Sequence, residues 1–226
     1  MSGPPPDFAR NFRRADRATR FLSAPLIRWD SRPATERAIK AFGEPCLIAA
    51  NHRSVMDVAV GIRALAAVGH SARVLSAEWL WDDPRLARLL DSIGAIRLRS
   101  GRGAIDTVAE AIECLDAGHH LLITPEGRVV PPEDRPTGVG SGHKIMSKIA
   151  CGAGVDVVPG ALIGTDKVWP RDDPRPIVRP WDRPTITMQF GDPVEMAPGL
   201  HRANVEAVMD AISEIILGLE PSSARR

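Results

Sequence analysis

His52 and Asp57 stand five positions apart, directly after the apolar run Cys46–Ala50. An imidazole that is oriented by a carboxylate can remove a proton from a hydroxyl group near neutral pH. The apolar run predicts a buried strand, and open α/β sheets bind their ligands where strands end. The alternative is a surface histidine beside a helix-capping aspartate, because so short a pair also arises by chance in a chain with six histidines.

A second group of polar residues follows another apolar run. Pro125, Glu126, Gly127 and Arg128 come soon after His120–Ile123, which also predicts a buried strand. The glycine allows a close backbone approach, and the arginine can bind a phosphate through two hydrogen bonds. A surface turn with a local Glu–Arg pair is the alternative.

The elements that must position these residues alternate along the chain. Proline lacks an N–H donor, so we expect Pro159 to interrupt its strand and bend it at a pocket wall. The alternation predicts a single α/β domain, with helices flanking a mostly parallel, mixed sheet. Strands are expected at 47–50, 73–76, 93–98, 120–123, 155–163 and 185–190, and helices at 56–68, 83–90, 104–115, 144–150 and 204–217.

The amino-terminal segment, residues 8–30, is rich in arginine. Its apolar side chains recur at helical spacing and predict one face of a helix, with arginines on another face. Such a basic amphipathic helix suits the surface of an anionic membrane, whereas packing on its own domain with a solvated arginine face is the alternative. The expected apolar face consists of Phe8, Phe12, Ala15, Thr19 and Leu22, and the expected basic face of Arg13, Arg17 and Arg20.

Composition excludes several classes of protein. A net charge of +1 and a pI of about 7.8 argue against a general nucleic-acid binder. The three cysteines are odd in number and far apart, which speaks against a disulfide framework or a zinc knuckle and favours a reducing compartment. No apolar stretch approaches the ~20 residues that span a bilayer, and no signal-peptide core is evident, so we expect a soluble or peripheral protein.

Three further features have two interpretations each. The glycine-rich segment 138–144 resembles a phosphate-binding loop but lacks P-loop spacing, and a flexible connector is the favoured interpretation. His119 and His120 are expected to pack rather than to bind a metal, since no nearby acid or cysteine completes a ligand set. Trp79 and Trp81 are expected in the core, and the alternatives are an acyl groove or a membrane-facing surface.

Taken together, the motifs resemble those of the glycerolipid acyltransferase superfamily, which includes the enzymes that acylate lysophosphatidic acid. The matching segments are Asn51-His52 with Asp57, then Pro125-Glu126-Gly127, then Val157-Val158-Pro159. A further segment, Gly94 to Arg99, looks like the Gly-x-Ile-x-x-x-Arg motif that the family has between the first two. The resemblance covers roughly residues 45–191, and four motifs in the family's order favour the functional interpretation of His52 and Asp57.

The resemblance implies a direct transfer mechanism. His52 would act as the general base on the acceptor hydroxyl, and Asp57 would hold the imidazole in the right tautomer. The hydroxyl would then attack the thioester of acyl-CoA or acyl-carrier protein, with no acylated residue and no metal or other cofactor. On a regular helix a five-residue step separates two side chains by about 140°, so the pair can meet only if His52 precedes the helix and Asp57 lies in its first turn.

The resemblance also implies an acceptor site made of Glu126, Gly127 and Arg128, with Arg99 as the upstream partner that helps to bind the phosphate. The family usually has Glu-Gly-Thr-Arg, and here the arginine comes one position early. In the upstream motif, Ser100 occupies the usual arginine position. Both departures lie on the acceptor side, so the chemistry is expected to be retained and the acceptor's identity can differ.

We therefore expect an O-acyltransferase that acylates a lysophospholipid such as 1-acylglycerol-3-phosphate. A different acceptor (an amine, a glycolipid or a small alcohol) and a catalytically silent lipid-binding module are the alternatives. The expected partners are the acyl donor, the lipid acceptor and a membrane surface contacted through residues 8–30, with no nucleic acid. The expected location is cytoplasmic, on the inner face of the cell membrane. The expected segments are 1–40 (amphipathic, helical), 41–220 (acyltransferase domain) and 221–226 (frayed tail).

Overall fold

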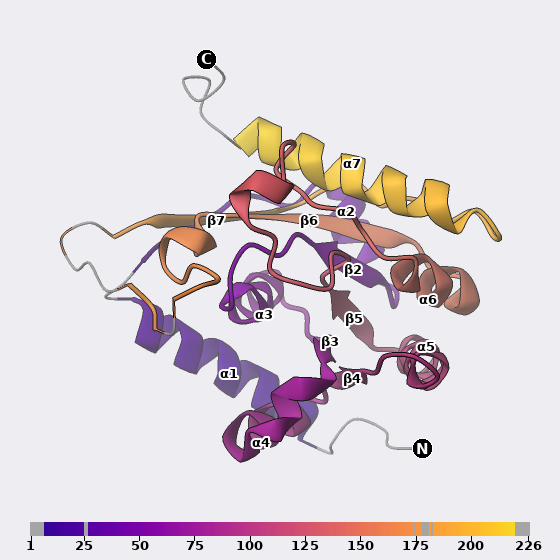
Figure 1. The fold of residues 1–226 in the computed structure, drawn as a ribbon, viewed down its shortest axis with the longest axis horizontal. Helices are drawn as coiled ribbons and strands as arrows, with labels where there is room; N and C mark the ends of the chain where they lie inside the picture. The colour runs from indigo at the N-terminus through magenta and orange to yellow at the C-terminus, as the bar shows by residue number, and fades with distance from the viewer. Residues whose placement is uncertain (1–6, 25–26, 174, 178–180, 182, 220–226) are drawn as a thin grey trace.

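The computed structural model describes residues 7–24, 27–173, 175–177, 181 and 183–219, and the expected tail 221–226 lies outside them. Within these residues, one seven-stranded sheet has the order β1-β7-β6-β2-β5-β3-β4 (Figure 1). All neighbouring strands are parallel except β6 and β7. The predicted mostly parallel, mixed α/β sheet is thus confirmed. The strands are β1 (Arg28–Ser31), β2 (Leu47–Ala50), β3 (Ala72–Ala77), β4 (Ile96–Leu98), β5 (His120–Ile123), β6 (Val157–Ile163) and β7 (Thr185–Phe190).

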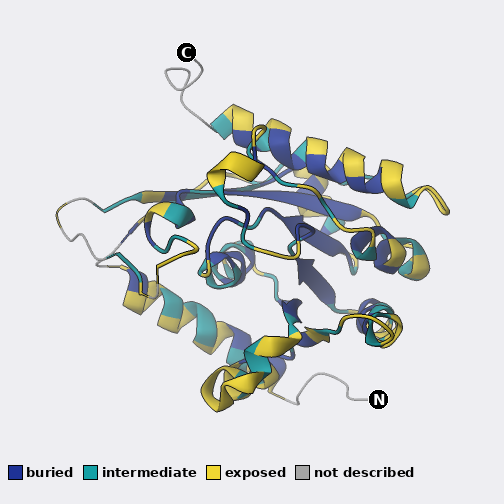
Figure 2. Cartoon of the chain, in the orientation of Figure 1, coloured by how far each residue is buried: buried dark blue, intermediate teal, exposed yellow. Residues whose placement is uncertain are grey.

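Helices cover both faces of the sheet, because successive side chains of a strand point to opposite faces. In β2, Leu47 and Ala49 join the core beneath α5, α6 and α7, whereas Ile48 and Ala50 join the core beneath α1, α2, α3 and α4. Figure 2 shows the buried strands between these two layers. The α-helices are α1 (Phe8–Ser23), α2 (Glu36–Ala41), α3 (Asp57–Ala67), α4 (Pro84–Ser92), α5 (Gly103–Asp116), α6 (Ile145–Ala153) and α7 (His201–Leu219), and the 3-10 helices are η1 (Glu78–Asp82), η2 (Pro132–Asp134) and η3 (Thr165–Lys167).

The chain before residue 41 is more than a helical segment. After α1 it forms β1, which pairs in parallel with β7 at the edge of the sheet, and then the short helix α2. Thr35 caps α2 by accepting a hydrogen bond from the backbone N–H of Ala38. Sequence periodicity missed β1 because its residues, Arg-Trp-Asp-Ser, carry neither an apolar run nor a clear alternation.

Pro159 does not interrupt its strand, contrary to the expectation from sequence. β6 is continuous from Val157 to Ile163, and its pairing with β7 begins at Gly160, opposite Phe190. The missing N–H of Pro159 therefore falls at the end of that ladder, where it removes no β6–β7 hydrogen bond. The Pro159 carbonyl still accepts a hydrogen bond from Gly191 N at 2.9 Å.

Helix α1 packs on α3 through only part of the predicted apolar face. Phe8 and Phe12 are buried, whereas Leu22, expected on the same face, is 67% exposed. The arginines of the predicted basic face, Arg13, Arg17 and Arg20, are exposed. No helix among the described residues is both long and apolar enough to cross a membrane.

Candidate functional site

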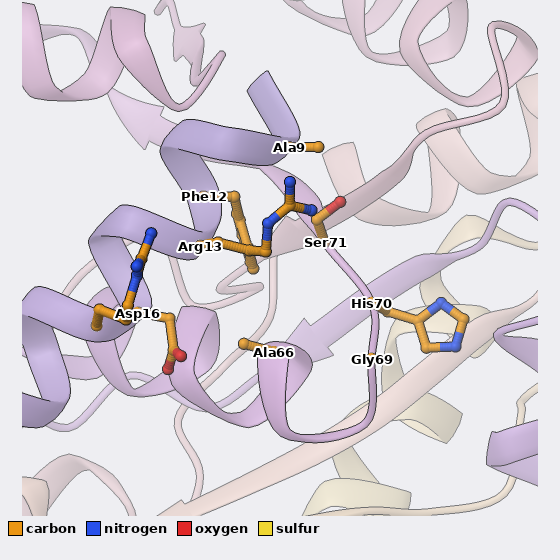
Figure 3. A pocket seen from close by; sticks show the side chains of 9 residues that line it. Ala9, Phe12, Arg13, Asp16, Ala66, Gly69, His70 and Ser71 are labelled. Carbon is orange, nitrogen blue, oxygen red and sulfur yellow. The ribbon is translucent and has the colours of Figure 1, made fainter. Parts of the chain in front are cut away.

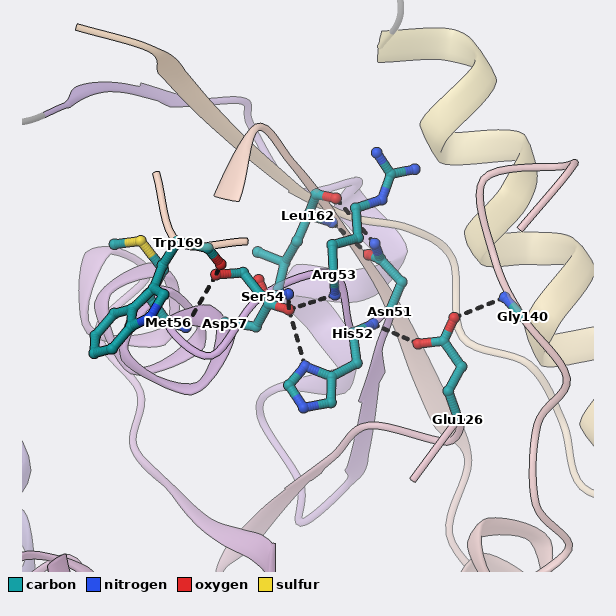
Figure 4. Close-up of polar contacts among 10 residues, drawn as sticks. All are labelled: Asn51, His52, Arg53, Ser54, Met56, Asp57, Glu126, Gly140, Leu162 and Trp169. Carbon is teal, nitrogen blue, oxygen red and sulfur yellow. Dashed lines mark hydrogen bonds and ion pairs between the residues drawn. The ribbon is translucent and has the colours of Figure 1, made fainter. Parts of the chain in front are cut away.

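The site lies at the carboxyl ends of β2 and β5, which are parallel neighbours paired from Leu47 with Leu121 to Ala49 with Ile123. Because carboxyl ends of parallel neighbours meet at one edge, the residues that follow β2 come close to those that follow β5. The backbone N–H of His52 donates a short hydrogen bond to Oε2 of Glu126. The two groups of polar residues found in the sequence are therefore brought into direct contact (Figure 4).

The His52–Asp57 pair has the arrangement that the spacing required. His52 lies in the turn before α3, Asp57 is the first residue of that helix, and His52 Nδ1 lies 2.9 Å from Asp57 Oδ2. A carboxylate only accepts hydrogen bonds, so Nδ1 carries the proton and Nε2 of the neutral ring is left as a base. Among the described residues, no hydrogen bond to Nε2 is found, and the His52 side chain is 17% exposed.

The Asp57 carboxylate is fixed by the backbone as well as by His52. Its Oδ2 also accepts hydrogen bonds from Arg53 N at 2.5 Å and Ser54 N at 2.7 Å, and the side chain is fully buried. The amino-terminal end of α3 further favours a negative charge at this position. The turn is tied to the opposite side by Ser54 Oγ, which donates to the Trp169 carbonyl at 2.7 Å. The imidazole thus rests against a carboxylate that cannot easily turn away.

Asn51 extends the sheet beyond the end of β2. Its Nδ2 donates to the Leu162 carbonyl at 3.0 Å, and its Oδ1 accepts from Leu162 N at 2.6 Å. The buried side-chain amide thereby replaces a backbone peptide in the ladder between β2 and β6 and fixes where His52 leaves the sheet. Sequence reasoning gave Asn51 no role of its own, although its place between a buried strand and His52 was a usable signal.

Glu126 is a buried clamp between two loops. Its Oε2 accepts from His52 N and its Oε1 from Gly140 N at 2.8 Å, and the residue is 3% exposed. Burial raises the pKa of its carboxyl, while the hydrogen bonds from Gly140 and His52 act in the opposite direction. Both carboxylate oxygens are engaged with backbone N–H groups, so the structure shows Glu126 holding the His52 loop against the glycine-rich segment.

The two arginines expected at the acceptor site pair with different carboxylates. Arg99 lies 3.6 Å from Glu110 on α5 and is one-third exposed. Arg128 lies 2.6 Å from Asp134 in η2, and both side chains of this pair are about half exposed. Surface ion pairs of this kind contribute little to stability, so either arginine can exchange its partner for a phosphate at small cost.

A cavity of about 330 Å³ lies beside this edge of the sheet, between the carboxyl ends of β4 and β5 and the start of α6. Gly127 lines it, and Leu98 places it next to Arg99. Its walls combine apolar side chains with His143 and Lys144, which suits an amphiphilic ligand better than a purely polar one. The cavity is lined by Leu98, Ile123, Thr124, Pro125, Gly127, His143, Lys144 and Ile145.

A second cavity, of about 450 Å³, lies far from this edge (Figure 3). It is formed by α1 and by the end of α3 and the turn that follows it, among them Ala66, Gly69 and His70. Asp57 begins α3, so this cavity lies at the opposite end of the helix from the His52–Asp57 pair.

The structure shows where the glycine-rich segment 138–144, His120 and Trp79 lie. The glycine-rich segment packs closely on α7: a Cβ on Gly138 would lie 2.8 Å from Ile216, and one on Gly142 would lie 2.8 Å from Val205. His120 is buried, with Cys46 Sγ and His70 Nδ1 each 3.3 Å from one of its ring nitrogens. Within the described part of the chain, no cluster of potential metal ligands is found. Trp79 is 68% exposed, so its predicted burial in the core is wrong.

Comparison with known proteins places this site in a family. The sequence model of the family described as Acyltransferase matches residues 30–163, more than half of the chain. This chain belongs to the acyltransferase family. The matched segment includes β2, the His52–Asp57 pair, Glu126 and the whole of β6. The resemblance to the 1-acylglycerol-3-phosphate acyltransferase superfamily inferred from the motifs is thereby confirmed.

Individual members of the acyltransferase family resemble the chain over different lengths. The chloroplastic 1-acyl-sn-glycerol-3-phosphate acyltransferases of Brassica napus and Arabidopsis thaliana are each 27% identical to it over 128 residues, which is 56% of the chain. The chain spans about a third of the length of these relatives (35% and 34%). The chain is also similar to the crystal structure of the 1-acyl-sn-glycerophosphate acyltransferase PlsC from Thermotoga maritima. The match covers 95% of this chain and 81% of the PlsC chain, with a TM-score of 0.68 and 19% sequence identity, so the two share a fold.

Proposed function

We propose that this acyltransferase moves a fatty acyl group from an acyl thioester to a hydroxyl of a lysophospholipid, such as 1-acylglycerol-3-phosphate. The observation that carries the proposal is the 2.9 Å contact between His52 Nδ1 and the immobilised Oδ2 of Asp57, which leaves Nε2 as a base at the carboxyl end of the central strands. Relatives whose names give that acceptor support the choice of substrate.

The reaction follows from the proton positions. Nε2 of His52 takes the proton of the acceptor hydroxyl as its oxygen attacks the thioester carbonyl carbon, and the carbonyl π electrons move to oxygen. The imidazolium is stabilised by Asp57, which stays ionised. The tetrahedral intermediate then collapses, the carbon–sulfur bond breaks, and the departing sulfur receives the proton from Nε2. An ester and a free thiol result, with no acylated residue and no metal or other cofactor required.

Arg99 and Arg128 would hold the acceptor's phosphate beside the 330 Å³ cavity, each leaving its present carboxylate partner. Gly127 would let the acceptor approach the backbone closely because glycine has no Cβ, and its φ of 67° is one that glycine adopts readily. In this arrangement Glu126 contributes through the loops that it clamps. Residues 8–30, through the exposed arginines of α1, would contact an anionic membrane, and the location that we propose is the cytoplasmic inner face of the cell membrane.

A different acceptor is the second candidate, and one observation favours it. Arg128, the residue nearest to the family's phosphate-binding arginine, points to Asp134 of η2 with a 2.6 Å contact. If Arg128 keeps this partner during turnover, its guanidinium would not be available to bind a phosphate. A neutral acceptor, such as a glycolipid or small alcohol, does not need that interaction.

Release of free thiol tests both candidates. The purified chain is incubated with acyl-CoA or acyl-carrier protein and a panel of lysophosphatidate, lysophosphatidylcholine, a glycolipid and an amine. The first proposal expects turnover with lysophosphatidate, lost by about 10²–10⁴-fold in His52→Ala and reduced mainly through KM in Arg128→Ala. Turnover confined to a neutral acceptor supports the second candidate. No turnover with any acceptor, together with intact liposome binding, would leave a lipid-binding module.

A further inference from the structure

Three exposed apolar side chains gather on η1 and α4. Trp79 is 68% exposed, Leu86 40% and Leu89 51%, although side chains of these types usually lie in the core. Leu86 and Leu89 are three residues apart and share one face of α4. In α4 itself only Leu90 is buried, so the helix presents nearly its whole surface outward (Figure 2). Because η1 and α4 pack against each other, these side chains lie on adjoining elements, and exposed apolar surface of this kind is typical of an interaction site.

The structure holds this surface rigidly in place. Asp83 caps α4 by accepting from Arg85 N at 2.7 Å and Leu86 N at 3.2 Å. Trp81 packs against the core beneath α4, its Nε1 donates to Asp91 at 2.8 Å, and the Arg97 guanidinium lies 4.9 Å from its ring. Trp81 and Leu90 attach η1 and α4 to the core. The exposure of Trp79, Leu86 and Leu89 therefore follows from how these two elements are packed and does not come from a frayed helix end.

Charge on the neighbouring helix selects the kind of partner. Helix α1 lies beside α4 and is tied to it by Asn11 Nδ2, which donates to the Ser92 carbonyl at 3.0 Å (Figure 1). Asp16, the one acid of α1, pairs with Arg63, and Asp7, directly before the helix, pairs with Arg10. Four more arginines of α1 are exposed, namely Arg13, Arg14, Arg17 and Arg20. The exposed acids of η1 and α4, with the residue that joins them, are Glu78, Asp82, Asp83 and Asp91, and the four arginines of α1 together with Arg85 and Arg88 of α4 outnumber them. An apolar surface beside this net positive charge complements the anionic headgroups and acyl boundary of a bilayer.

The position of η1 relates this surface to the candidate site. η1 begins directly after Ala77, the last residue of β3, and β3 is parallel to β5. A bilayer against η1 and α4 would therefore meet the same edge of the sheet from which His52 follows β2. A lysophospholipid could then reach the base from the membrane without crossing bulk water.

We propose that η1 and α4 form a lipid-docking surface, in which Trp79, Leu86 and Leu89 enter the headgroup region of an anionic bilayer. It extends the contact proposed for residues 8–30 to a neighbouring apolar surface, and its use in delivering substrate rests on the proposed acyltransferase function. Trp suits the depth of the headgroups, because its ring is apolar and its N–H is polar.

The test compares Leu86→Ser/Leu89→Ser with the matched control Ile39→Ser/Leu200→Ser. Ile39 on α2 is 57% exposed and Leu200, directly before α7, is 58% exposed. Sedimentation with vesicles of phosphatidylcholine and phosphatidylglycerol measures binding. We expect the α4 variant to bind at least about tenfold more weakly, since even partial burial of two leucines is worth more than 1.4 kcal/mol. The control should bind like the parent chain. Trp79→Ala should also weaken binding and should reduce the quenching of tryptophan fluorescence by brominated lipid.

Equal binding of the α4 variant and the control overturns the proposal, as does a parent chain that does not bind these vesicles. A dimer that dissociates in the α4 variant, with vesicle binding unchanged, identifies a second copy as the occupant and also overturns it. The acyltransferase function is read separately, as thiol release with a short-chain acceptor in free solution, which the α4 variant should retain. If the parent chain releases no thiol but the α4 variant loses vesicle binding, only the acyltransferase proposal fails.

Discussion

Replacing Asp57 by asparagine separates the two roles that its carboxylate can have toward His52. Oδ2 accepts hydrogen bonds from His52 Nδ1, Arg53 N and Ser54 N, at 2.9, 2.5 and 2.7 Å. Two of these donors belong to the backbone and cannot turn away. In Asp57→Asn the amide oxygen must therefore occupy the Oδ2 position, because an NH₂ group there would face N–H donors. His52 Nδ1 keeps its acceptor, the tautomer is preserved, and only the negative charge is lost.

The expected magnitude follows from that difference. A hydrogen bond to a charged group contributes about 1.5–3 kcal/mol and a neutral one about 0.5–1.5 kcal/mol, so the transition state loses about 1–2 kcal/mol. This corresponds to a decrease of about 5- to 30-fold in kcat/KM. Where the same substitution of a catalytic aspartate leaves the histidine in the wrong tautomer, as in the Ser-His-Asp triad, it costs about 10⁴-fold. His52→Ala should fall by about 10²–10⁴-fold.

Thiol release with lysophosphatidate as acceptor measures the effect, and Asp192→Asn, which alters an exposed ion pair with Arg37, serves as the control. The asparagine variant also buries an NH₂ group at the Oδ1 position, where the described residues offer no partner. Its free energy of unfolding should therefore decrease by about 1–3 kcal/mol, and assays belong well below its melting temperature. If Asp57→Asn loses as much activity as His52→Ala, the inference that the backbone preserves the tautomer is refuted.

Three further predictions concern the scaffold. Glu126→Gln can accept through only one atom and leaves either His52 N or Gly140 N without its partner, so the melting temperature should decrease by about 2–10 °C, and an unchanged value would contradict the clamp. Gly164→Ala would place a Cβ 2.2 Å from the Thr185 carbonyl oxygen, at a φ of 88°. In the control Gly69→Ala, at a φ of 86°, the Cβ meets no atom within 4 Å. Urea denaturation should show that the free energy of unfolding decreases by at least about 2 kcal/mol more at position 164 than at position 69. Burial and the nearby His70 and His119 lower the pKa of His120 from 6.5 to about 4. The unfolded chain therefore binds more protons between these values, and the free energy of unfolding should fall as pH decreases from about 6.5 to 4. His120→Asn should flatten this dependence, and an unchanged slope would exclude His120 as its source.

Much of the fold could be predicted because its central strands are short apolar runs between helical patterns. β2, β5 and β7 begin and end where the sequence places them. β1 could not be predicted, since a polar four-residue strand at a sheet edge is stabilised by its pairing with β7 rather than by its own pattern. The exposure of Leu22 and Trp79 was equally hidden, because periodicity assigns a residue to a face of a helix but does not say whether another element covers that face.

The sequence by itself determined which residues are candidates for the chemistry: a histidine and an aspartate spaced so that they meet only across the start of a helix, and an acid after a neighbouring strand. Tertiary structure alone decided what surrounds them. Glu126 holds the His52 backbone, Asn51 joins β2 to β6, and Arg128 pairs with Asp134. These contacts join positions up to 111 residues apart along the chain. The partners of Glu126 and Asn51 are selected by strand order and register, which arise from the packing of the whole sheet and not from local spacing.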